Sequence, residues 1–258
     1  MKITVLGCGP SQGVPVIGGR WGKCDPANPK NRRTRPSVLV ACDGVNILVD
    51  TSPDLRSQLI DNEINRIDAV LFTHLHYDHV AGIGELRTLS YLAGHRIDTY
   101  GTPDVINGLV ERNAYLFHEE ASDDTNLYAP VATANHFEYG VPLDVRGVEV
   151  LPFRQDHGIC ETAGFRIGAF GYTTDAVLLD DAAFDALDGI EVWVVDCLRE
   201  TPHPTHAHFE RTLEWIERVG PKRAIFTHMN FETDYEKTLA KCPPGVEPGY
   251  DGLTIEIG

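Results

Sequence analysis

Short apolar runs alternate with amphipathic stretches along the chain, and turns that contain glycine or proline separate them. Short runs rich in β-branched and aromatic residues predict strands, because a strand buries one or both of its faces. The strands expected on this basis are Ile3–Leu6, Val38–Ala41, Asn46–Val49, Asp68–Thr73, Leu143–Arg146, Val148–Phe153, Phe165–Ile167, Phe170–Thr173, Glu191–Asp196 and Ala224–Thr227. The dipeptide Asp43-Gly44 lies between two of these runs and predicts a hairpin turn.

Helices are expected where apolar residues recur with helical spacing. After Asn46–Val49, Ser52 is expected to be an N-cap and Pro53 to occupy the first helical position. Leu55, Leu59 and Ile60 would then form the apolar face of this helix. Further helices are expected from Thr102-Pro103-Asp104 onward, over Glu85–Leu92, and over Phe209–Val219, which Gly220-Pro221 ends.

The order of these elements predicts an α/β protein in which two sheets pack together with helices outside. The 258 residues suffice for one large domain, and no linker or repeat interrupts them, so we expect a single domain over 1–258. Residues 113–140 have no clear periodicity and are expected to be irregular. Such segments are often lids or interface arms.

The composition excludes some classes of protein. The formal net charge of −16 disfavours nucleic-acid binding, and no apolar run approaches the ~20 residues that span a bilayer. The chain starts with a short strand and not with a secretory leader, and its six cysteines are scattered. We therefore expect a cytoplasmic protein with free, mostly buried thiols.

The strongest chemical signal is the segment Thr73–His79, which follows a predicted strand. It holds His74, His76, Asp78 and His79, and imidazole and carboxylate groups suit zinc, manganese, iron or cobalt. In a tight turn, the first two histidines are placed to hold one ion and the other two residues to reach a second. Further candidate ligands lie at or near the ends of predicted strands, namely His157, Asp175 and His228.

This order of ligands, HxHxDH followed by His, Asp and His, resembles the metallo-β-lactamase superfamily over nearly the whole chain. The stretches Leu6–Pro15, Tyr172–Asp175, Thr227-His228 and Tyr250–Gly252 resemble its phosphodiesterase branch, and most of all the phosphoribosyl 1,2-cyclic phosphate phosphodiesterases. The resemblance implies an αββα four-layer sandwich and two divalent metal ions, zinc or manganese. It also implies a homodimer, for which residues 113–140 are the candidate interface. It implies one ion on His74, His76 and His157, a second on Asp78, His79 and His228, and Asp175 bridging both.

By the same resemblance, a hydroxide activated by the two metals attacks phosphorus, and a histidine protonates the leaving oxygen. We choose His206 as this general acid, and with Asp78 it forms the candidate catalytic pair. His208 and, less favoured, His203 are alternatives in the same stretch. Three carboxylates are candidates to orient the ligands through hydrogen bonds: Asp50, Asp196 and Asp251.

The region from Gly19 to Arg35 departs from that family. The phosphonate-pathway enzymes carry a structural zinc on clustered cysteines and a later histidine, whereas this stretch has only Cys24, and Asn230 and Phe231 follow His228. We expect that zinc to be absent. The stretch is also rich in basic residues, any of which is a candidate to bind a substrate phosphate: Arg20, Lys23, Lys30, Arg32, Arg33 and Arg35.

The activity expected is hydrolysis of a small cyclic or linear phosphodiester with a ribose- or nucleotide-like substrate. Processing of tRNA 3′ ends is an alternative that the acidic charge disfavours. Hydrolysis of a β-lactam or a thioester is possible on the same fold. A nucleotide-binding protein that contains metal but has no turnover is the alternative outside the enzymes.

Overall fold

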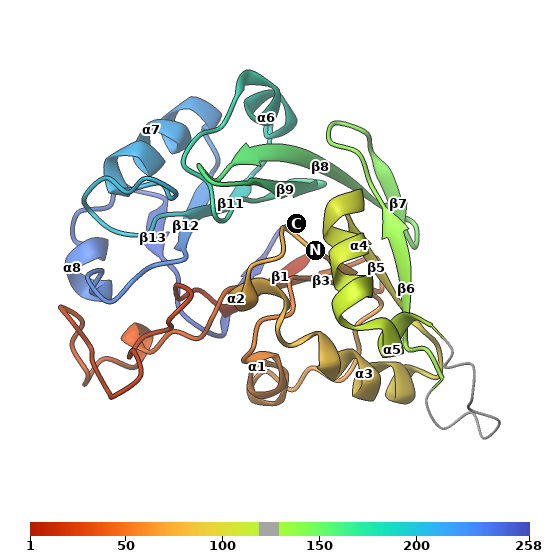
Figure 1. Ribbon diagram of the computed structural model, residues 1–258. Helices are drawn as coiled ribbons and strands as arrows, with labels where there is room; N and C mark the ends of the chain where they lie inside the picture. The colour runs from red at the N-terminus through yellow and green to blue at the C-terminus, as the bar shows by residue number, and fades with distance from the viewer. Residues whose placement is uncertain (119–128) are drawn as a thin grey trace.

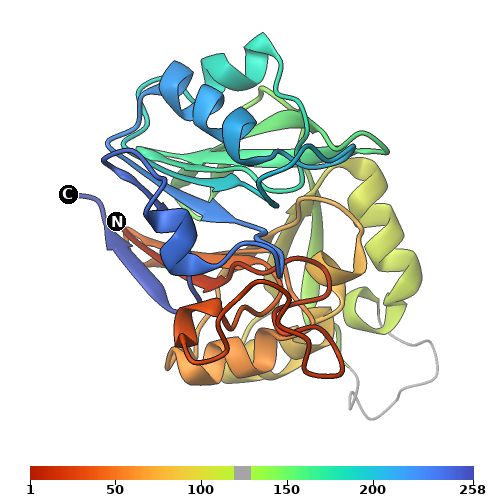
Figure 2. The same ribbon diagram turned by 90° about the vertical axis from the view of Figure 1, so that its left-hand side faces the viewer.

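The computed structural model describes residues 1–118 and 129–258, and within these residues two seven-stranded sheets pack face to face (Figures 1 and 2). The strands of the first sheet are, in spatial order, β14 (Leu253–Glu256), β1 (Lys2–Gly7), β2 (Ser37–Cys42), β3 (Val45–Val49), β4 (Ala69–Leu71), β5 (Ile97–Gly101) and β6 (Ala132–His136). The second sheet has the order β13 (Val246–Pro248), β12 (Arg223–Thr227), β11 (Val192–Asp196), β10 (Phe170–Tyr172), β9 (Glu161–Ile167), β8 (Val148–Asp156) and β7 (Leu143–Val145).

Helices cover the outer faces of both sheets (Figure 1). On the first sheet they are α1 (Leu55–Asp61), α2 (Tyr77–Val80), α3 (Leu86–Ala93), α4 (Pro103–Arg112) and α5 (Ala114–Phe117), and on the second α6 (Asp181–Ala186), α7 (Phe209–Val219) and α8 (Tyr235–Leu239). Short 3₁₀ turns lie at η1 (Pro29–Asn31) and η2 (Ile83–Glu85). Helices on both outer faces of two packed sheets confirm the expected αββα sandwich.

Strand alternation explains the two hydrophobic layers. On β2, Val38 and Val40 point into the core between the sheets, whereas Leu39 points into the layer between the first sheet and its helices. On β3, Ile47 and Leu48 divide in the same way. Because successive side chains of a strand point to opposite faces, a continuous apolar run fills both layers at once.

Local differences from the expected elements have identifiable causes. Helix α1 begins at Leu55, later than expected, because Ser52 accepts a hydrogen bond from Asp54 N in a preceding turn, 3.1 Å away. Gln58, instead of Ile60, completes its buried face, because the Gln58 amide donates to Thr34 Oγ1 and Arg35 O at 2.8 Å. Ile60 is 58% exposed, so its expected place on the apolar face was wrong.

The segment 113–140 is not irregular throughout, because α5 and β6 lie within it. β6 was missed because its sequence, Ala-Thr-Ala-Asn-His, has weak strand character, and it forms by parallel pairing with β5. Residues 119–128 of the candidate dimer interface lie outside the described residues. Among the helices at 1–118 and 129–258, none has both the length and the apolar character that a membrane span requires.

Candidate metal centre

The motif after β4 divides into a turn and a short helix. His74 lies just beyond the strand, and His76 is the N-cap of α2, whose first turn carries Asp78 and His79. The strand end and the helix start therefore present these four side chains from one compact segment. All except His76 are buried.

The structure brings the seven candidate ligands into two groups that share one residue. The ligand atoms of His74, His76, His157 and Asp175 lie within 4.8 Å of one another. A second group, defined in the same way, consists of Asp78, His79, Asp175 and His228. These are the groups that the family resemblance implies, with Asp175 common to both.

The donor atoms in these groups are arranged in a way that suits bound metal ions. Nε2 of His74 and Nε2 of His79 are buried and make no hydrogen bond among the described residues. The latter nitrogen lies 3.0 Å from Asp175 Oδ2 and 3.4 Å from Asp78 Oδ2. Buried imidazole nitrogens that face carboxylates without hydrogen bonds are a donor set suited to divalent cations.

The charges of these side chains also favour a bound cation. Burial lowers the pKa of His79, but the carboxylates of Asp175, Asp78 and Asp50 outweigh burial and raise it well above its usual range. Burial also lowers the pKa of His228, but Asp175 and Asp78 outweigh burial and raise this pKa to about 9. Protons therefore offset the buried carboxylates when no metal is bound, and a cation at this place would displace them.

Three residues at or just after strand ends adopt a left-handed backbone conformation. They are Asp50 after β3, Asp175 beyond β10, and His228 after β12, with φ of 63°, 53° and 58°. Aspartate tolerates this conformation, whereas for histidine it costs on the order of 1–3 kcal/mol. Backbone strain of this kind is common at functional sites.

Hydrogen bonds fix the orientation of two candidate ligands. Asp50 accepts from Thr73 N and Thr73 Oγ1 at 2.8 Å, and its Oδ2 lies 2.7 Å from His79 Nδ1. With its acceptors so occupied, Asp50 holds the proton on Nδ1 of His79 and leaves Nε2 free. His157 Nδ1 in the same way donates to Thr205 O at 2.6 Å. A carboxylate or carbonyl behind an imidazole is the usual outer partner of a metal-binding histidine.

His206 lies against both groups, unlike the alternatives. Its Nδ1 is 3.1 Å from Asp196 Oδ2, its Nε2 is 3.9 Å from Asp175 Oδ1, and its ring stacks on that of His228 at 4.6 Å. His208 is instead the N-cap of α7. His203 lies beside Thr205, whose Oγ1 is 3.2 Å from its Nδ1, and its ring is 5.3 Å from that of His206 between centroids.

Asp251 does not touch the candidate ligands. Its carboxylate accepts from Cys8 N at 3.1 Å and from Thr34 N at 2.7 Å, so it fixes the end of β1 to the loop before β2. Its expected role in orienting ligands was therefore wrong. The prediction rested on its place in the stretch Tyr250–Gly252, but its hydrogen bonds go to Cys8 and Thr34.

The basic stretch mostly serves the fold. Lys23 pairs with Glu232 at 3.1 Å, Arg35 with Asp54 at 3.0 Å, and buried Arg33 donates to Thr233 O at 2.8 Å. Lys30 lies over the rings of Tyr235 and Tyr250. Cys24 is buried, and its thiol donates to backbone carbonyls. Among the described residues, no metal-binding group includes a cysteine.

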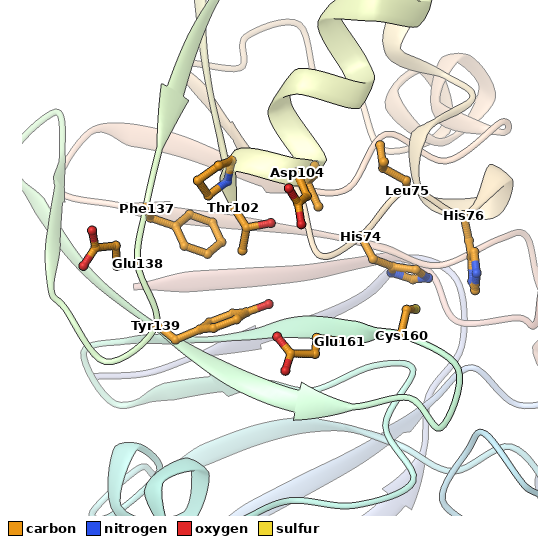
Figure 3. Close-up of a pocket in the computed structure, with 12 residues that line it drawn as sticks. His74, Leu75, His76, Thr102, Asp104, Phe137, Glu138, Tyr139, Cys160 and Glu161 are labelled. Atoms are coloured by element: carbon orange, nitrogen blue, oxygen red, sulfur yellow. The ribbon is translucent and has the colours of Figure 1, made fainter.

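A cavity of about 690 Å³ adjoins the first group of ligands (Figure 3). His74 and His76 line one end of it, and Phe137 and Tyr139 line the other. No pattern in the sequence indicated this cavity, because its walls come from α4 and from the segments that precede β7 and begin β9. The aromatic residues Phe137 and Tyr139, which lie in the segment 113–140, were the one feature of the sequence that could have indicated the cavity.

Comparison with known proteins agrees with this geometry. A family model described as the β-lactamase superfamily domain matches residues 45–229. The crystal structure of a diphosphatase from the PhnP family superposes with a TM-score of 0.88 and 32% identity, over 100% of this chain and 98% of that one. A ribonuclease Z from Mycobacterium sp. (strain KMS) is 27% identical over 263 residues, which cover 89% of this chain and 92% of the relative.

A further relative is an octanoyltransferase from Porphyromonas gingivalis (strain ATCC BAA-308 / W83), 31% identical over 261 residues. The match covers all of this chain but only 52% of that protein, so the chain spans about half the length of this relative. The family model alone covers most of the chain, and it confirms the resemblance that the histidine motif carried. The chain belongs to the metallo-β-lactamase superfamily of hydrolases.

Proposed function

We propose that this protein is a di-metal phosphodiesterase that hydrolyses a small cyclic or linear phosphodiester, with a ribose- or nucleotide-like group. The observation that carries the proposal is that two ligand groups share Asp175, while His206 Nε2 lies 3.9 Å from the same carboxylate. A paired donor set with a histidine beside it suits displacement at phosphorus, which requires both charge stabilisation and a proton donor.

The residues named for each ion are those of the two groups. His74, His76 and His157 would hold one ion, Asp78, His79 and His228 the other, and Asp175 both. Bound divalent ions supply a water of lowered pKa and offset negative charge on phosphoryl oxygens. Zinc and manganese both accept this mixture of imidazole and carboxylate ligands.

The protein's own contribution to proton transfer centres on His206. Asp196 holds the Nδ1 side of the ring, so Nε2 is directed toward the shared carboxylate. In this orientation His206 is the candidate to protonate the leaving oxygen as the P–O bond breaks. Asp196 acts through His206 and is therefore a positioning residue.

The family members similar to this chain favour phosphorus chemistry. The similar crystal structure is described as a diphosphatase, and the similarity at 32% identity extends over the whole chain. Ribonuclease Z activity is the second candidate because relatives of that name match most of the chain. Against it stands the net charge of −16, which opposes the approach of a polyanion.

The test is hydrolysis by the metal-free protein before and after reloading with manganese or zinc. Bis(4-nitrophenyl) phosphate reports the reaction class, and 2′,3′-cyclic nucleotides, 5-phosphoribosyl 1,2-cyclic phosphate and a tRNA precursor report the substrate. We expect metal-dependent cleavage of small diesters and intact precursor. Cleavage of the tRNA precursor alone would favour ribonuclease activity. No turnover of any of these substrates with both ions bound would refute the proposal.

A further inference from the structure

The cavity beside His74 and His76 is long enough to take the organic part of a bound ester. Its volume of about 690 Å³ lies in the range of small-molecule sites. Figure 3 shows Asp104 and Glu161 on opposite walls, with Tyr139 extending between them. A phosphoryl group held at the histidines would direct one of its two alcohol groups into this space.

The charge of the walls is negative. Within the described part of the chain, three carboxylates line the cavity and no lysine or arginine does. Asp104 lies in the first turn of α4, and its carboxylate has no hydrogen bond or ion pair with any other residue at 1–118 or 129–258. Glu161 pairs with Arg154 at 3.0 Å, but the same guanidinium also binds Asp180 at 3.0 Å. The charge of Arg154 is therefore offset by two carboxylates. Arg112 donates to the backbone oxygen of Leu75 at 3.4 Å, but its side chain does not line the cavity.

Aromatic rings form the far end. Phe137 is buried and Tyr139 half-buried, with ring centroids 6.1 Å apart. Burial, and then the charge of Glu161, raise the pKa of Tyr139 to about 12, so its hydroxyl stays protonated in ordinary buffers. Aromatic faces combined with carboxylates are the combination that attracts organic cations, whereas a second phosphate would face like charges.

We propose that this cavity binds a cationic amine or quaternary ammonium group carried by one alcohol of the phosphodiester. The proposal rests on the proposed function, because the phosphoryl group must lie at the metal ligands. It narrows one of the two alcohols of the diester to an amino alcohol, in which a short linker separates the cation from phosphorus, and leaves the other alcohol to the ribose- or nucleotide-like group. It also predicts that 5-phosphoribosyl 1,2-cyclic phosphate, which bears a second phosphate, is a poor substrate.

The test compares matched esters with one leaving group. All three esters release 4-nitrophenolate and differ in the second alcohol. It is choline, a cation, in 4-nitrophenyl phosphocholine, an uncharged nucleoside in 4-nitrophenyl thymidine 5′-phosphate, and a second nitrophenyl group in bis(4-nitrophenyl) phosphate. We expect kcat/KM for the choline ester to exceed that for the thymidine ester by about tenfold. Asp104→Asn should lower this ratio severalfold, and Asp104→Lys should bring it below one. Glu149→Gln, an exposed change elsewhere on β8, should leave the ratio unaltered.

The outcomes separate the two proposals. Turnover of all three esters with no preference for the choline ester, or a preference that Asp104→Lys does not reduce, would overturn the cation site and leave the phosphodiesterase standing. A preference for the thymidine ester would do the same and would favour a nucleoside. No turnover of any ester by the metal-loaded protein would overturn both.

Discussion

Oδ2 of Asp196 lies 3.1 Å from Nδ1 of His206 and accepts a hydrogen bond from Ala176 N at 2.9 Å. Because Ala176 directly follows Asp175, one carboxylate connects the proposed acid to the backbone of the proposed bridging ligand. A change at any of these positions is therefore expected to affect the others, and single substitutions must be judged by more than lost activity.

His206→Ala is expected to retain both metal ions yet lower turnover by ~10²–10⁴-fold for an ester with a poor leaving group. The loss should be much smaller for 4-nitrophenolate, which departs without a proton. His208→Ala is the matched control, because His208 is at the N-cap position of α7 and its side chain makes no capping hydrogen bond there. Equal losses for good and poor leaving groups would remove the role of His206 as the acid.

Asp175→Ala is expected to remove at least one metal ion and nearly all activity, because the two ligand groups share this carboxylate. Burial opposes its ionisation, but His228 and His79 lower the pKa of Asp175 well below its usual range. Its loss would thus remove the carboxylate that contributes most to the charge balance of those two histidines. Elemental analysis after gel filtration is the measurement, and two retained ions per chain would contradict the bridging assignment.

Asp50→Asn is expected to weaken metal binding by roughly 10–100-fold without removing a ligand. An amide NH₂ in place of Oδ2 would meet the Nδ1–H of His79 and favour the tautomer with its proton on Nε2. Titration with zinc against a competing chelator measures this. Asp61→Asn, an exposed change on α1, serves as control. Unchanged affinity in the Asp50 variant would indicate that this carboxylate supports only the fold.

The metal-free protein is expected to lose stability as the pH rises from about 6.5 to about 9. In the folded state the His228 pKa is about 9, above the ordinary value of 6.5, so folding holds an additional proton across this window. Its favourable pairing is complete below pH 6.5 and is lost above pH 9. Thermal unfolding in chelator across this range is the measurement.

Zinc-loaded protein should depend on pH less steeply in the same window, because the ion replaces that proton. Isothermal titration in buffers of different ionisation enthalpy should accordingly record protons released on binding at pH 7. A metal-free protein that is as stable at pH 9 as at pH 6.5 would refute the assignment of charge to His228.

The sequence predicted those parts of the site that depend on local order. His74 to His79 lie within six residues after a strand, and chain connectivity alone brings them together. His157 and His228 directly follow their strands, and Asp175 lies three residues beyond β10, so the sheet edge collects them. Such features follow from short-range geometry, and the expected sandwich follows from the same strand pattern.

Other features depend on packing between distant elements, which periodicity does not encode. Asp104 faces Tyr139 across the cavity only because the N-terminus of α4 lies opposite the end of the second sheet. β14 pairs with β1 from the other end of the chain, and Gln58 displaces Ile60 from a buried face. In the last two cases a strand pairing or a tertiary hydrogen bond outweighs local propensity.

The candidate ligands are divided between the two sheets: His74, His76, Asp78 and His79 follow a strand of the first, whereas His157, Asp175 and His228 follow strands of the second. A cation bound by ligands from both sheets would hold the two sheets together, since separating them would break its coordination. Ligand binding and folding would then be linked by mass action. The melting temperature would keep rising with free zinc well beyond stoichiometric loading, and cellular metal supply would govern how long the protein survives as well as how fast it works.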